Sequence, residues 1–90
     1  MKSYLIRYPI TNPKNDYQSI IRCIQENYEL NIQIGEGTWI IKTNQCAEHI
    51  LNLLLCYCDR KEKLIVIEIY KDWLCHNLSE PIKNWLKRFL

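Results

Sequence analysis

Residues 64–70 read LIVIEIY, and this apolar stretch with a single acid at Glu68 decides the fold. Six of the seven residues are apolar, which is typical of a strand that lies inside a sheet with one face well packed. Two other stretches have the same character and carry one basic residue each, YLIRY at 4–8 and TWIIK at 38–42. A fourth, half-buried strand is predicted at residues 31–34, NIQI, where polar and apolar residues alternate.

Three stretches have the spacing of helices. In the first, which follows a turn at 11–15, the apolar face is Tyr17, Ile20, Ile21, Ile24 and Tyr28. The second begins at a cap on Thr43 or Asn44, and its core face is Cys46, Ala47, Ile50, Leu51, Leu54 and Tyr57. The third has Ser79 as its N-cap, and its stripe is Ile82, Trp85, Leu86, Phe89 and Leu90.

The predicted order is strand, helix, strand, strand, helix, strand and a last helix. Gly35-Glu36-Gly37 marks the hairpin between the second and third strands. Right-handed crossovers then favour an α+β fold of the ferredoxin-like βαββαβ type, with a four-stranded antiparallel sheet of order 4-1-3-2. Two helices would cover one sheet face, and the C-terminal helix at 79–90 would be added to a core at 1–70. Residues 1–90 are thus predicted to form one domain.

Period-two alternation divides the strand residues between two sheet faces. We placed the charged residues on the open face, away from the helices. The predicted helix side is Tyr4, Ile6, Tyr8, Trp39, Ile41, Ile65, Ile67 and Ile69. The predicted open side is Leu5, Arg7, Ile40, Lys42, Leu64, Val66, Glu68 and Tyr70.

Composition points toward a second subunit. Of the 90 residues, 48% are hydrophobic, including three Trp and six Tyr, which is generous for so small a domain. A net charge of +2 is too small to indicate nucleic-acid binding by itself. No stretch has the pattern of a signal peptide or the length of a membrane span, so we expect a cytoplasmic protein with no membrane partner. Its five cysteines are then expected to be reduced.

Several of these segments, in this order, resemble the small SinR-like hypothetical proteins. The matching residues are YLIRY at 4–8, Asp16-Tyr17, TWIIK at 38–42, CAEHI at 46–50, and LIVIEI at 64–69 followed by Trp73. That family is similar to the CRISPR-associated spacer-integration scaffold and to virulence-associated protein D. The resemblance implies a ferredoxin-like fold, a homodimer formed through the open sheet face or its edges, and in some members ribonuclease activity or nucleic-acid contact.

The chain departs from the family at the end of the first strand. The family pattern has a Tyr-Asp pair there, whose carboxylate is the candidate metal ligand, whereas this sequence has Tyr8-Pro9. Proline offers no side-chain oxygen to a hard cation. We therefore expect a non-catalytic homodimeric binding module, with a degenerate or metal-dependent endoribonuclease as the alternative.

The candidate site residues follow from this expectation. The dimer or binding face would comprise Leu5, Arg7, Pro9, Ile40, Lys42, Val66, Glu68 and Tyr70, with Glu68 paired to Arg7 across a strand or a dimer axis. Asp16 and Glu68 are weak catalytic candidates, and Asp16 is explained more simply as an acid in the first turn of a helix. Lys83, Lys87 and Arg88 are candidate contacts with nucleic acid, and the candidate partners besides a second copy are RNA, DNA or another protein.

We expect neither a metal nor another cofactor. Cys56 and Cys58 on one helix would point in opposite directions, which does not suit a shared zinc ion. Cys75 with His49 lacks any local signature of a nucleophile pair.

Overall fold

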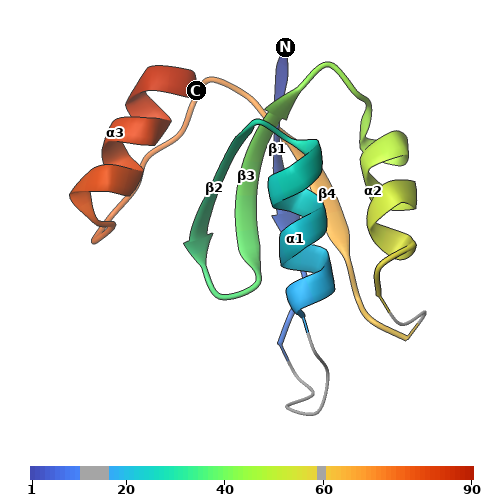
Figure 1. Cartoon of the computed structure of the whole chain (residues 1–90). Coiled ribbons are helices and arrows are strands. Elements are labelled where there is room, and N and C mark those ends of the chain that lie inside the picture. The colour runs from blue at the N-terminus through green and yellow to red at the C-terminus, as the bar shows by residue number, and fades with distance from the viewer. Residues whose placement is uncertain (11–16, 59–60) are drawn as a thin grey trace.

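The computed structural model describes residues 1–10, 17–58 and 61–90. In those residues the elements run in the predicted order (Figure 1). They are β1 (Lys2–Arg7), α1 (Gln18–Asn27), β2 (Leu30–Gly35), β3 (Thr38–Thr43), α2 (Ala47–Leu55), β4 (Ile65–Ile69) and α3 (Glu80–Phe89).

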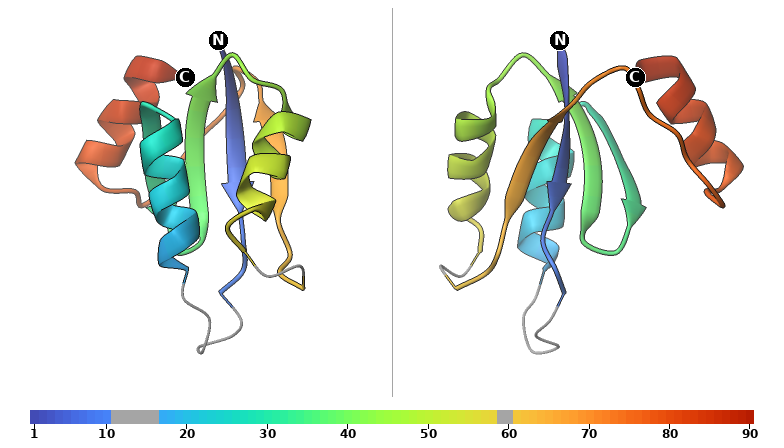
Figure 2. Two further views of the ribbon diagram at one scale, coloured as in Figure 1. Left: turned by 45° about the vertical axis from the view of Figure 1, so that its right-hand side comes forward. Right: turned by 180° about the vertical axis from the view of Figure 1, so that it is seen from behind.

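The strands form one four-stranded sheet of order β2-β3-β1-β4, in which every neighbouring pair is antiparallel. Read from the β4 edge, the order is 4-1-3-2. Consequently α1 joins two parallel strands with β3 between them, and α2 joins two parallel strands with β1 between them. Figure 2 shows α1 and α2 on one face of the sheet and α3 beside β2. The α+β class predicted from the sequence is confirmed.

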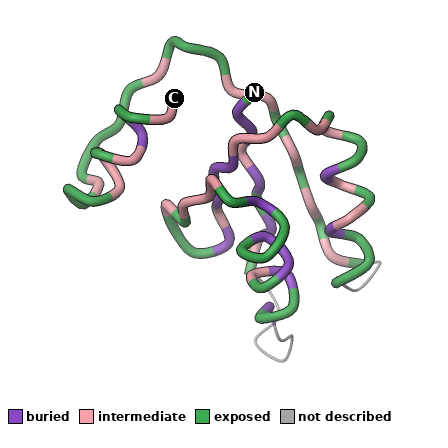
Figure 3. The backbone as a smooth tube through the Cα atoms, turned by 45° about the horizontal axis from the view of Figure 1, so that its top comes forward, coloured by how far each residue is buried: buried purple, intermediate pink, exposed green. Residues whose placement is uncertain are grey.

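The core lies between the sheet and the helices α1 and α2. The buried side chains of β1 are Tyr4 and Ile6, and Tyr8 follows directly after the strand. They form one cluster with Trp39 and Ile41 of β3. The helices contribute apolar side chains at helical spacing, which are Ile20, Cys23, Ile24, Ile50 and Leu54. Figure 3 shows the buried positions along β1, β3 and α1. The predicted faces of the first and third strands are therefore confirmed.

The predicted face of β4 is wrong. Cross-strand partners point to the same side of a sheet, and Leu5 lies opposite Ile67 while Tyr4 lies opposite Glu68. Ile65, Ile67 and Ile69 therefore lie on the open face, and Val66 and Glu68 lie on the helix side. Val66 and Leu64 pack against the core. Alternation shows which residues share a face but not which face it is. The charge of Glu68 did not identify the open face, because its carboxylate stays partly exposed on the helix side, where it pairs with Lys2.

The end of β1 is held by the β2–β3 hairpin. Glu36 and Gly37 form the predicted turn between β2 and β3, and Gly37 has a φ of 67°. The Tyr8 amide donates to the carbonyl oxygen of Gly37 at 2.8 Å, and Trp39 Nε1 donates to the Tyr8 hydroxyl at 3.0 Å. These contacts fix the chain where Pro9 follows.

Two predicted helix starts can be compared with the structure. α2 begins after Cys46 as its N-cap rather than after Thr43 or Asn44. The Thr43 hydroxyl instead accepts from the Gln45 amide at 3.2 Å, which stabilises the turn before the helix. α3 begins after Ser79, as predicted, and Pro81 lies in its first turn. The expected cap of the first helix at Asn15 lies outside the described residues.

Candidate functional site

The candidate site is the outer half of the open face, on and beside the edge strand β4. Its centre is the β4 stripe, which we define as Ile65, Ile67 and Ile69. Ile65 is 47% exposed and Ile67 is 50% exposed. Large aliphatic side chains next to each other at such exposure are a common mark of an interaction surface.

β4 pairs with β1 on one side, and its other edge has no neighbouring strand among the described residues. Figure 2 shows α3 beyond the opposite edge of the sheet, next to β2, so that it leaves β4 uncovered. Free backbone N–H and C=O groups on such an edge are a template for pairing with another strand. The stripe and the edge thus offer apolar contact and main-chain hydrogen bonds in the same place.

A shallow hollow adjoins the stripe at the end of β1. Arg7, Pro9, Lys63, Leu64 and Ile65 line it, and its volume is about 130 Å³. Two of its lining residues are cations and none is a carboxylate. A hard divalent ion needs oxygen ligands, so this lining does not supply a metal site where Pro9 replaces the family's aspartate.

Arg7 and Glu68 do not pair within the chain, because they lie on opposite faces. Arg7 donates from its guanidinium to the Thr38 hydroxyl at 3.3 Å. The Glu68 carboxylate lies 3.5 Å from the Lys2 ammonium and accepts from Tyr70, whose pKa this hydrogen bond raises. The predicted pairing of Glu68 with Arg7 is wrong for a single chain. Glu68 is thus engaged with Lys2 and Tyr70 of its own chain.

The other predicted site residues have different surroundings, and among them Leu5 lies beside the stripe as the cross-strand neighbour of Ile67. Leu5 and Ile40 are on the open face, but Ile40 is buried near the centre of the sheet. Lys42 points toward α3, and its ammonium donates to the Phe89 carbonyl oxygen at 2.6 Å. Val66 is directed to the core, and Tyr70 is exposed just beyond β4. Asp16 lies outside the described residues.

The basic side chains of α3 face different surroundings. Lys83 forms an ion pair with Glu80 at 2.7 Å, one turn earlier, and this ammonium lowers the pKa of Glu80. Lys87 and Arg88 are exposed, and the Arg88 guanidinium lies 5.2 Å from the centre of the Phe89 ring. Only part of the predicted basic surface is thus available, and its contact with nucleic acid stays a prediction.

The cysteines do not gather. None of the five forms a disulfide; Cys23 is buried, and Cys46, Cys56 and Cys75 are exposed. Burial raises the pKa of the Cys23 thiol, which keeps it protonated. α2 ends at Leu55, so Cys56 and Cys58 do not lie on one helix, and the prediction that they share a helix is wrong. Within the described ranges, no group of three or more His, Cys, Asp or Glu side chains is placed to hold a metal ion.

The β4 stripe was missed as an exposed feature when the sequence was interpreted, although its three isoleucines stood in the most informative segment. A signal was present: Leu64 and Val66 could serve the core equally well, leaving the isoleucines for the other face.

No protein-family model, curated protein or solved structure matches this chain. Across the part of the chain that the structure describes, none of the helices combines the length and apolar character that crossing a bilayer requires.

Proposed function

We propose that this chain is a ferredoxin-like domain that forms a homodimer and acts by binding, as a non-catalytic module of the CRISPR-scaffold-like type. The split arrangement of its parallel strand pairs supports the ferredoxin-like assignment. The observation that carries the proposal is the exposure of Ile65 and Ile67 on β4, which has no neighbouring strand at its outer edge among the described residues. A binding role accords with Pro9, which supplies no metal ligand at the end of β1.

A second copy suits this edge because the β4 stripe is symmetrical about Ile67. If two β4 strands pair antiparallel about a two-fold axis at Ile67, the residue meets itself, and Ile65 meets Ile69 of the second copy. The isoleucines of both copies then form one continuous apolar band across the joined sheets.

The positions of the charged side chains on β4 are compatible with this pairing about Ile67. Val66 would lie opposite Glu68 of the second copy, so no two like charges face each other across the axis. Glu68 keeps Lys2 of its own chain, 3.5 Å away. A register centred on Glu68 would instead bring two carboxylates together, which is unfavourable.

The edge strand alone is too small for a stable dimer, which needs about 800 Å² per partner. α2 packs against β4, and exposed Leu55 at its end and Tyr57 just after it add apolar surface. The hollow at Arg7 and Pro9 continues the open-face side. Together these surfaces offer an apolar centre with a charged rim, as interfaces between proteins do.

Cysteine cross-linking tests both the dimer and its register. In a background where Cys46, Cys56 and Cys75 are serine, Ile67→Cys should form a covalent dimer under mild oxidation, because the two positions meet at the axis. Ile65→Cys alone should not, whereas an equimolar mixture of Ile65→Cys and Ile69→Cys chains should. Equal cross-linking by every variant would show random collision and contradict the register.

Sedimentation and RNA incubation test the two halves of the function. The unmodified chain should sediment as a dimer at micromolar concentration, and Ile67→Asp should shift it to a 10.9 kDa monomer. Leu74→Ser, which also removes an exposed aliphatic side chain but lies off the stripe, is the matched control and should stay dimeric. Cleavage of RNA with Mg²⁺ or Mn²⁺, retained after repurification, would contradict the non-catalytic assignment and favour the endoribonuclease. A monomer throughout would remove the dimer.

A further inference from the structure

α3 lies beside β2 on the side of the open face, and a cavity remains between the helix and the sheet, which we call the α3 cavity. Its volume is about 230 Å³. The sheet contributes Leu5 and Ile40, the segment after β4 contributes Trp73 and Leu78, and α3 contributes Leu86. Every residue that lines it is apolar in character. It opens to solvent beside Leu74, which is 98% exposed.

A recess of this size that is lined by apolar side chains and open to solvent leaves apolar surface without a protein partner. Water fills such a space poorly, because it needs two to four polar partners and the lining offers almost none. Apolar cavities of roughly 150 Å³ are known to take up small apolar molecules. The α3 cavity is therefore suited to an apolar occupant.

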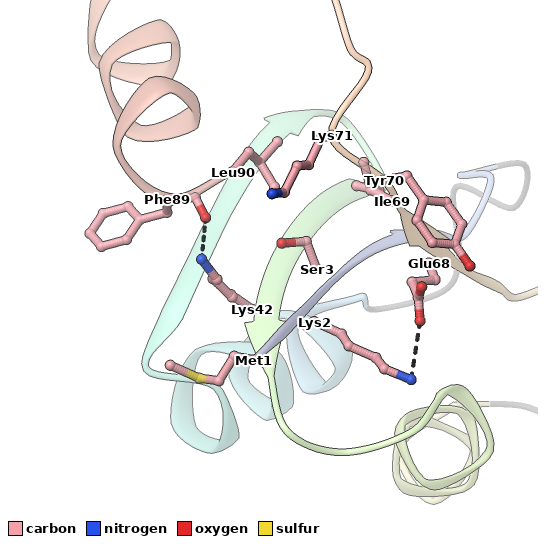
Figure 4. A pocket seen from close by; sticks show the side chains of 10 residues that line it. All are labelled: Met1, Lys2, Ser3, Lys42, Glu68, Ile69, Tyr70, Lys71, Phe89 and Leu90. Atoms are coloured by element: carbon pink, nitrogen blue, oxygen red, sulfur yellow. Dashed lines mark hydrogen bonds and ion pairs between the residues drawn. The ribbon is translucent and has the colours of Figure 1, made fainter.

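A second space, the lysine pocket, adjoins the α3 cavity near the C-terminal end of α3. Its volume is about 300 Å³, and it shares Ile69 and Leu90 with the α3 cavity. Lys2, Lys42 and Lys71 line it, and Glu68 is its only acidic side chain. In Figure 4 the amino groups of Lys42 and Lys71 point toward the end of α3, whereas Lys2 points to Glu68.

The lysine pocket therefore has a surplus of positive charge. Lys2 is occupied by Glu68 at 3.5 Å, and Lys42 donates to the neutral carbonyl oxygen of Phe89. Within residues 1–10, 17–58 and 61–90, neither Lys42 nor Lys71 is paired with a carboxylate side chain. An anion placed there would meet two ammonium groups.

We propose that the α3 cavity and the lysine pocket together bind one single-chain anionic amphiphile, of the class of fatty-acid carboxylates. Its alkyl chain lies between α3 and the sheet, and its carboxylate lies against Lys42 and Lys71. A water takes up about 30 Å³ in the liquid and a methylene is of similar size, so the α3 cavity holds roughly eight methylene groups. A ten-carbon acid fits this length with its head group in the lysine pocket.

Other occupants suit the two spaces less well. A nucleotide would seek aromatic faces for its base, and Trp73 is the only aromatic residue that lines the α3 cavity. A second copy of the chain has the exposed β4 stripe, which shares only Ile69 with the α3 cavity. The proposal is thus independent of the dimer.

Titration calorimetry and NMR with the whole chain test the site, with decanoate as the probe and decanol and acetate as controls. Decanoate should saturate at one molecule per chain and shift the amides of Ile40 and Leu86. Decanol should bind at least threefold more weakly, because it lacks the charge, and acetate should not saturate. Lys71→Gln should weaken decanoate at least threefold and leave decanol unchanged. Lys63→Gln, an exposed lysine at the far end of β4, is the matched control and should change neither.

Leu5→Phe adds bulk within the α3 cavity and should weaken both decanoate and decanol, with the circular dichroism spectrum unchanged. Several results would overturn the proposal. Equal binding of decanol and decanoate would show that the lysine pocket takes no part. Binding without saturation, or shifts confined to Ile65 and Ile67, would indicate general adhesion to the exposed stripe. Absence of binding, with contacts between Leu86 and a second copy, would show that another chain fills the space.

Discussion

The ammonium of Lys42 donates a 2.6 Å hydrogen bond to the carbonyl oxygen of Phe89 and so ties strand β3 to the last turn of α3, 47 positions further along the chain. The last carbonyl groups of a helix lack partners within the helix and carry partial negative charge, so a lysine there satisfies both needs. The other main attachment of α3 is Leu86, which is 3% exposed. The last helix is thus held by few contacts.

Lys42→Met should loosen α3 and leave the rest of the fold intact. A partly exposed charged hydrogen bond contributes about 1 kcal/mol, which corresponds to roughly a fivefold change in an opening equilibrium. We expect amide hydrogen exchange in α3 to accelerate several-fold while exchange in β1 and β3 stays constant. Lys87→Met, an exposed lysine on the same helix, should have no such effect. Equal acceleration in both variants would show that Lys42 does not anchor α3.

Deletion of residues after Asn77 should leave a folded core. The apolar stripe of α3, taken alone, would instead predict that the truncated chain is unfolded or insoluble. The core cluster between the sheet and the helices α1 and α2 contains no residue of α3, although Leu86 is itself buried, which argues for survival of that core with the open face exposed. We now expect native-like circular dichroism, a lower Tm and binding of a hydrophobic dye. A random-coil spectrum would show that the core does not fold without α3.

Gly37→Ala should destabilise the fold, and Gly35→Ala should not. At Gly37, φ is +67°, and a Cβ would lie 2.2 Å from the Tyr8 carbonyl oxygen, which is backbone and cannot move aside cheaply. Nothing lies within 4 Å of a Cβ at Gly35. Chemical denaturation should show a loss of about 2 kcal/mol or more for Gly37→Ala and a change below about 0.5 kcal/mol for Gly35→Ala. Similar losses would contradict the clash.

Local patterns in the sequence were enough to predict the element order, the hairpin at Glu36 and Gly37, and the inner faces of β1 and β3. In those two strands one alternating set is larger and more aromatic, as in Tyr4 and Trp39, so the core side is distinguishable. In β4 both sets are aliphatic, and one charge at Glu68 decided wrongly. The face of β4 that points to the core follows only from the register of β4 with β1, which is a long-range property.

The α3 cavity could not be predicted for a related reason. Its linker part, Trp73 to Leu78, has no periodicity, and Asn77 adopts a φ of 61° that a sequence pattern does not announce. The stripe on α3 was identified correctly, but the stripe does not show how closely the helix approaches the sheet. Tight docking would have buried Trp85 fully, whereas that side chain is half-buried.

Alkaline pH should destabilise the protein through Tyr28. Desolvation raises the pKa of Tyr28 to about 12, and its hydroxyl donates to Gln45 Oε1 at 2.9 Å. Because the folded pKa lies above the unfolded value near 10, this contribution is fully present below pH 10 and is lost as pH rises toward 12. The free energy of unfolding should fall over that interval, and less steeply in Tyr28→Phe. Identical slopes would show that Tyr28 is not the group responsible.

Tyr8→Phe and Tyr17→Phe form a matched pair with opposite expectations. The two rings stack with centroids 5.7 Å apart, and phenylalanine preserves this contact at either position. The Tyr8 hydroxyl accepts the buried Trp39 Nε1 hydrogen bond, so its removal leaves a buried donor unsatisfied, which costs about 1–3 kcal/mol. The Tyr17 hydroxyl is buried without a partner among the described residues, so its removal should be neutral or slightly stabilising. Urea denaturation at pH 7 should therefore rank Tyr17→Phe at or above the unmodified chain and Tyr8→Phe clearly below it. Equal losses in the two variants would contradict the assignment of both hydroxyl groups.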